Sequence, residues 1–138
     1  MATETGARLG LKYLDTNGFG AAQGGRGYYL PVDIAVRSDG RIYVLSRGDA
    51  IQGGNGIKIT DIEHHYFETI SGRGTDPGKF ISATAIAFDA GDRLFMADEV
   101  LQRITIFDAE NNYVSHWGTE GSGPGEFDGP SGIAFDRD

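Results

Sequence analysis

The chain has 138 residues, enough for one domain, with 22 glycines, 11% aromatic residues and no cysteine. Its net charge is −8 and its basic residues are scattered singly, which argues against the basic surface that nucleic acids and anionic membranes require. Without cysteine there is no disulfide or thiolate metal site, and without a signal peptide or a run of ~20 apolar residues we expect a soluble protein, cytoplasmic by default.

The first predicted element is an apolar segment, Leu9 to Leu14, followed by glycines at positions 18, 20, 24 and 25. We interpret residues 9–31 as the fourth strand and exit loop of a preceding structural unit. Residues 32–72 then form one predicted unit and residues 83–118 a second. In the second unit, strands are expected at Ile86–Phe88, Arg93–Ala97, Arg103–Phe107 and Tyr113–Trp117, with polar turns between them. Residues 130–138 are the predicted first strand of a further unit.

These units are copies of one repeat. A shift of 47 positions aligns about 35 residues without a gap, and an earlier copy aligns at a shift of 52. The five extra positions lie between Arg47 and Ile57 in a glycine-rich stretch, which predicts a longer loop. The matches across the connection between units are Gly74/Gly121, Pro77/Pro124, Gly78/Gly125 and Phe80/Phe127. A repeated unit of four short strands is typical of a propeller blade.

The same residues resemble a known family. Trp117-Gly118, Gly121, Pro124-Gly125-Glu126-Phe127, Pro130 and Gly132–Asp136, with Ala97-Asp98 and Arg103–Asp108 from the middle copy, are similar to the NHL-repeat pattern over about residues 10–138. The resemblance implies an all-β fold of four-stranded antiparallel blades: two complete blades and two flanking halves of an incomplete, six-bladed propeller. The first copy departs from it, with Ser46-Arg47 standing in place of Ala97-Asp98.

The repeated residues have structural interpretations. The glycines permit positive φ in the connections, and Phe80 and Phe127 are expected to fill the space between neighbouring blades. In the family, the positions of Asp98 and Arg103 make polar contacts that stabilise loops. The ligand-face candidates are Asp33, Arg47, Asp98, Glu99 and Arg103.

The positions of the three histidines do not indicate a metal site. His64 and His65 fall in the turn between third and fourth strands, and His116 falls on the outermost strand. A zinc site needs three or four converging ligands.

Two functions remain open. The leading one is a non-enzymatic binding scaffold for a protein or small ligand, with no cofactor. The alternative is a fragment of a metal-dependent propeller enzyme, similar to lyases or lactonases, with Ca²⁺ or Zn²⁺ at the axis. Asp33, Asp98 and Glu99 are then expected to contribute to a calcium or general-base site near the axis. Two blades cannot close a ring. The chain is therefore expected to be part of a longer propeller, or to form a homo-oligomer through its exposed blade faces and edges.

Overall fold

The computed structural model describes residues 13, 27–49 and 54–136. The described residues form strands, turns and loops but no helix, and so none that could cross a membrane. The predicted strand at Leu9–Leu14 lies outside the described residues apart from Tyr13, as do its glycines.

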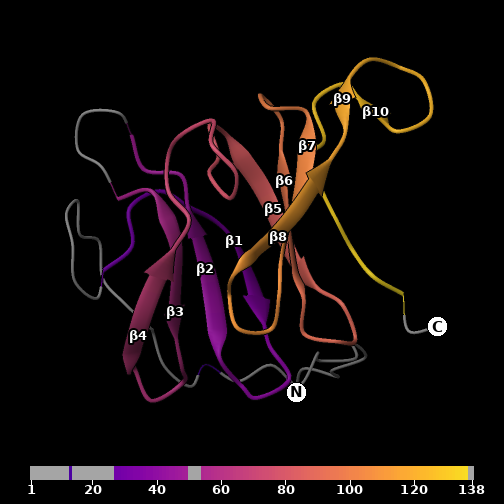
Figure 1. Cartoon of the computed structure of the whole chain (residues 1–138). Coiled ribbons are helices and arrows are strands. Elements are labelled where there is room, and N and C mark those ends of the chain that lie inside the picture. The colour runs from indigo at the N-terminus through magenta and orange to yellow at the C-terminus, as the bar shows by residue number, and fades with distance from the viewer. Residues whose placement is uncertain (1–12, 14–26, 50–53, 137–138) are drawn as a thin grey trace, which may run out of the picture.

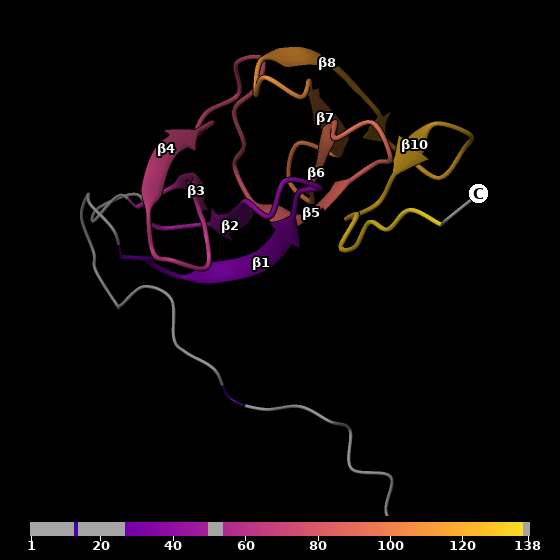
Figure 2. The same ribbon diagram turned by 90° about the horizontal axis from the view of Figure 1, so that it is seen from below.

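Two four-stranded antiparallel sheets make up the fold (Figure 1). The first sheet contains β1 (Pro31–Val36), β2 (Ile42–Ser46), β3 (Gly56–Thr60) and β4 (Tyr66–Ile70), in that order. The second contains β5 (Ala83–Phe88), β6 (Leu94–Asp98), β7 (Arg103–Phe107) and β8 (Tyr113–Trp117). Strands β1 and β5 are the inner edges of their sheets and lie next to each other, whereas β4 and β8 form the outer edges (Figure 2). The predictions of an all-β fold and of four-stranded antiparallel units are confirmed.

The repeat extends to irregularities of the backbone. The ladder between the first and second strands shifts register between Pro31 and Asp33 in one sheet and between Ala83 and Ala85 in the other. The ladder between third and fourth strands shifts at Ile59/Thr60 and at Ile106/Phe107. Each pair of sites is related by the sequence repeat, so the copies share their bulges as well as their strands.

The connections that follow the two sheets also fold alike. The Gly74 amide donates to the Phe80 carbonyl at 2.8 Å, and the Gly121 amide donates to the Phe127 carbonyl at 3.0 Å. Short parallel pairing accompanies both bonds: a bridge between Arg73 and Phe80, and the pair β9 (Thr119–Glu120) and β10 (Glu126–Phe127). The Pro-Gly turns within them, at Pro77 and Pro124, hold Gly78 and Gly125 at φ values of 79° and 77°, a region that glycine occupies at little cost.

The main hydrophobic core lies between the two sheets. Successive side chains of a strand point to opposite faces of its sheet, so every second residue of these strands points into this core. The inner face of the first sheet consists of Tyr43, Leu45, Ile57 and Ile59, and that of the second of Ile86, Leu94, Met96 and Phe107. Phe80, from the connection, is 0% exposed and belongs to the same cluster.

A smaller apolar cluster covers the opposite face of the second sheet. Ala85, Ala97 and Ile104 form it, and Phe95, Phe127 and Ile133 pack against it. Phe135 meets Phe95 edge-on at 4.8 Å between ring centroids, just as Phe88 meets Tyr43 at 4.8 Å. Residues 130–136, predicted as a first strand, are therefore placed like β5. They form no strand, because no described segment pairs with them.

Candidate binding rim

The sequence-predicted residues Arg47 and Glu99 meet where the sheets end. Arg47 follows β2, Glu99 follows β6, and Ser82 immediately precedes β5. The Arg47 guanidinium donates to the Ser82 hydroxyl and, at 2.9 Å, to the Glu99 carboxylate. The Ser82 hydroxyl in turn donates to Glu99 at 2.7 Å. We call Arg47, Ser82 and Glu99 the rim cluster; it connects the two sheets at one end.

The two charged members of the rim cluster are partly exposed to solvent, whereas Ser82 is buried. The side chains of Arg47 and Glu99 are each 37% exposed, so an incoming group can reach both. The hydroxyl of Ser82 lowers the pKa of Glu99, burial opposes this effect, and the positive charge of Arg47 adds to the lowering. Glu99 is therefore ionised at neutral pH, and the cluster presents a cation and an anion side by side.

Asp98 is a structural residue. It is 1% exposed, and its carboxylate accepts backbone amides on both sides. Ile81 and Ser82 donate from the connection that precedes β5, at 2.7 and 3.3 Å, and Val100 and Leu101 donate from the β6–β7 loop, at 2.9 and 3.0 Å. A carboxylate satisfied in this way holds the connection and the loop together and has no free face for a ligand.

Arg103 acts on the same connection. Its guanidinium donates to the carbonyls of Thr75, Asp76 and Lys79 at 3.4, 3.2 and 3.0 Å. The residue is 8% exposed. These contacts hold the Pro77-Gly78 turn against β7.

Asp33 is placed differently again. Its carboxylate accepts the Ile34 amide at 2.9 Å and, across the sheets, the Ile86 amide at 2.8 Å. It therefore joins β1 to β5 and is not part of the rim cluster. Of the five ligand-face candidates, the structure brings Arg47 and Glu99 together in the open and uses the other three in internal contacts.

The strand register corrects one sequence alignment. Ser46 pairs with Pro31, and Asp98 pairs with Ala83 in the same place of the second sheet. Ser46 is thus the equivalent of Asp98, and Arg47 the equivalent of Glu99; the expected match of Ser46-Arg47 with Ala97-Asp98 is one residue out of register. The bond from the Arg47 amide to the Leu30 carbonyl, 3.1 Å, matches that from Glu99 to Ser82, 3.2 Å.

Ser82 is the member of the rim cluster that sequence reasoning missed. The repeat places Leu30 and Gly129 at its position, so nothing in the pattern distinguishes it. Only the arrangement of both sheets shows that its hydroxyl lies between Arg47 and Glu99.

A second polar group lies in the β3–β4 turn. Asp61, Glu63 and His65 place one potential metal-ligand atom each within 4.8 Å of one another. The Asp61 carboxylate accepts the backbone amides of Glu63 and His65 at 3.0 and 2.9 Å, and His65 Nδ1 lies 2.9 Å from its other oxygen. Asp108 accepts the corresponding amides of its own turn without a histidine. The geometry is therefore that of a repeated turn.

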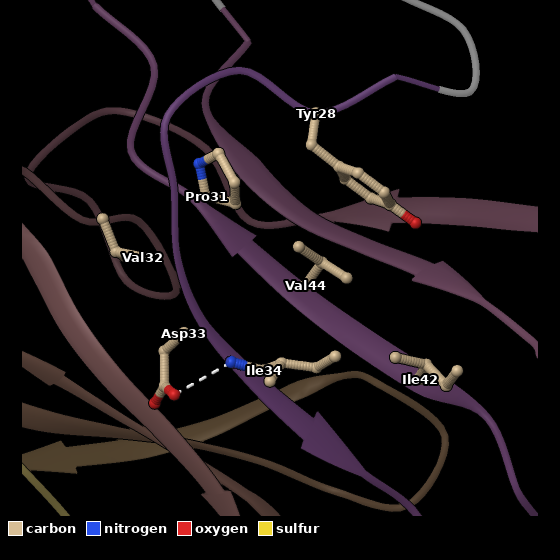
Figure 3. Close-up of a pocket in the computed structure, with 7 residues that line it drawn as sticks. All are labelled: Tyr28, Pro31, Val32, Asp33, Ile34, Ile42 and Val44. Atoms are coloured by element: carbon tan, nitrogen blue, oxygen red, sulfur yellow. Dashed lines mark hydrogen bonds between the residues drawn. The ribbon is translucent and has the colours of Figure 1, made fainter. Parts of the chain in front are cut away.

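The far face of the first sheet carries an apolar hollow of about 440 Å³. Tyr28, Pro31, Val32, Asp33, Ile34, Ile42 and Val44 line it. Figure 3 shows the Tyr28 ring beside Val44, with Ile34 and Ile42 further along the same face. We call Ile34, Ile42 and Val44 the outer face of the first sheet.

Comparisons with known proteins add no assignment. No protein-family model matches the chain, and no curated protein is similar to it.

Proposed function

We propose that this chain is a non-enzymatic binding module of the NHL propeller type, and that it recognises an exposed peptide segment of a partner protein at the rim cluster. The observation that supports this most is the pairing of Arg47 with Glu99 in the open, at the junction of two sheets. The pair lies outside the hydrophobic core, which leaves it free to change partners.

The chemistry of the cluster suits a peptide. A guanidinium presents several donors in a fixed fork, and a carboxylate accepts. A peptide offers carbonyls and amides in alternation, and both can be satisfied at once by a cation and an anion 2.9 Å apart. Exposed ion pairs contribute little to stability, so exchanging the Arg47–Glu99 contact for contacts with a ligand costs the fold little.

Selection from a random peptide library displayed on phage tests the proposal. Peptides enriched on the wild-type protein should lose at least about tenfold in affinity with Arg47→Ala or Glu99→Ala, the loss expected when one charge-assisted bond is removed. Arg93→Ala is the matched control, because Arg93 is also an exposed arginine in an ion pair, with Asp89 at 2.7 Å in the β5–β6 turn.

Either of two results would contradict the proposal. One is the absence of any enriched peptide. The other is a set of enriched peptides that bind the rim variants as tightly as they bind the wild type and the Arg93 control.

A further inference from the structure

The two outward-facing surfaces of the chain repeat the two surfaces that are buried against each other inside it. On the first sheet, Ile34, Ile42 and Val44 of the outer face occupy the positions of Ile86, Leu94 and Met96, which lie in the core between the sheets. The outer face of the first sheet is therefore a copy of the surface that the second sheet buries.

The second sheet shows the reverse relation. Phe95, Ala97, Ile104 and Ile106 share its outward face, because they are paired with one another across β6 and β7. They occupy the positions of Tyr43, Leu45, Ile57 and Ile59, the inner face of the first sheet. We call these residues the outer face of the second sheet.

These outer faces are only partly covered: Val44 on the first and Ala97 and Ile104 on the second are buried, whereas Ile34 and Ile106 are left more open than their equivalents. Ile34 is 59% exposed, whereas its equivalent Ile86 is 4% exposed. Ile106 is half-buried, whereas its equivalent Ile59 is fully buried. The hollow of about 440 Å³ lies on the first outer face, in the place where the second sheet receives Tyr43 and Leu45 from the first. Removing apolar surface of this kind from water is favourable and stabilises a contact that covers it.

The charges at the rim are complementary as well. Inside the chain, Arg47 of the first sheet pairs with Glu99 of the second, and the register makes these two positions equivalent. If the second sheet of one copy packs on the first sheet of another in the same way, Glu99 takes the place of Arg47 and Arg47 that of Glu99. Opposite charges then meet between copies, as they do within one.

We propose that the occupant of the two outer faces is a second copy of this chain, packed head to tail, so that the outer face of the second sheet covers the outer face of the first sheet of the next copy. The contact continues the sheet–sheet packing already present within the chain. Residues 130–136 lie in the place that β1 of the next copy takes, and Ile133 and Phe135 there correspond to Ile34 and Val36. Residues 130–136 form no strand ladder. In the proposed contact they are displaced by β1 of the next copy, which is held in a four-stranded sheet.

The proposal does not rest on a ligand at the rim. Head-to-tail contacts use two different surfaces, and this gives a specific experiment on the 138-residue chain. Ile34→Asp blocks the outer face of the first sheet, and Ile106→Asp blocks that of the second. Ile62→Asp is the matched control, because Ile62 is 59% exposed like Ile34 but lies in the β3–β4 turn. Mass is measured by light scattering over a range of concentrations, and far-UV circular dichroism checks folding.

We expect the wild type and the Ile62→Asp variant to exceed the monomer mass increasingly with concentration. Each blocked variant alone should remain at the monomer mass, and an equimolar mixture of the two should reach twice that mass and go no further. A monomeric wild type, a blocked variant that associates like the wild type, or a mixture that stays monomeric would overturn the proposal. If Ile106→Asp does not fold, Phe95→Asp blocks the same face in its place. Peptide binding at the rim is measured separately on the Ile34→Asp protein, so failure of one proposal does not imply failure of the other.

Discussion

The two sheets hold the connections that precede them by different polar groups. In the second sheet, Asp98 and Arg103 bind the backbone of residues 75–82. In the first sheet the equivalents are Ser46, whose buried hydroxyl has no hydrogen-bond partner among the described residues, and Gly56.

The first sheet uses other residues for the same task. Lys58 donates to the carbonyl of Gly27, and the Arg47 amide to that of Leu30. Arg47 is then directed across to Ser82 and Glu99 of the second sheet. The comparison teaches that the backbone of the repeat is maintained by its apolar residues and bulges, while the polar positions are free to differ. The rim cluster forms at one of these differing positions, which is Arg47 in the first sheet and Glu99 in the second.

The largest expected effect tests whether the core between the sheets, and not the repeat motif as such, stabilises the fold. Phe80→Ala should lower the free energy of unfolding by about 3–5 kcal/mol, as for other fully buried Phe side chains, because Phe80 is 0% exposed between two sheets. Phe127→Ala, at the same motif position but half-buried, should cost clearly less. Urea unfolding at equal protein concentration measures both. Equal losses of unfolding free energy in the two variants would show that the position in the motif, and not burial between the sheets, determines the stability that the Phe contributes.

The second prediction concerns the polar difference directly. Asp98→Ala should cost about 3 kcal/mol, because it removes a charged acceptor and leaves backbone amides of Ile81 and Ser82 without one. Ser46→Ala should be neutral or slightly stabilising, since the hydroxyl it removes is buried and unpartnered. The midpoints and slopes of urea unfolding curves compare the two variants. A large loss at Ser46 would mean that the first sheet relies on this position as much as the second does.

The extent of sequence-based prediction follows from the same comparison. The four strands of each unit could be predicted because apolar alternation and turn residues are local features that recur: β7 and β8 lie at the predicted residues 103–107 and 113–117. The roles of Asp98 and Arg103 as loop-stabilising residues were indicated by family resemblance. Ser82 could not be predicted, because its contacts come from a residue 35 positions away and another 17 away.

The first sheet departs from the repeat at Ser46 and Arg47. The shift of 52 residues aligns Ser46 with Asp98 and Arg47 with Glu99, whereas the match of Ser46-Arg47 with Ala97-Asp98 departs from that shift by one position. A strand register is fixed by backbone pairing, and a shift of one residue moves every side chain to the other face. The ladders of both sheets agree with the shift of 52 and make Arg47 the equivalent of Glu99. The sequence repeat therefore contained this equivalence, while the contact between the two side chains required the structure.

The smallest expected effect isolates the contact between the sheets at the rim. A double-mutant cycle of Arg47→Ala and Glu99→Ala, measured by urea unfolding at pH 7, should give a coupling of about 0.2–1 kcal/mol, because both side chains are over a third exposed and solvent screens their charges. The pKa of Glu99 is lowered in the folded protein, so its contribution is fully present above the unfolded pKa, about 4.3. It is lost as the pH falls through the lower, folded pKa.

Repeating the cycle at decreasing pH should therefore reduce the coupling towards zero, and 1 M salt at pH 7 should reduce it as well. The Arg93–Asp89 pair is the reference, because both of its residues belong to the β5–β6 turn of the second sheet and the pair does not connect the sheets. A coupling at Arg47–Glu99 that persists in acid and in salt would mean that the two sheets are held at the rim by the Ser82 hydroxyl and not by charge.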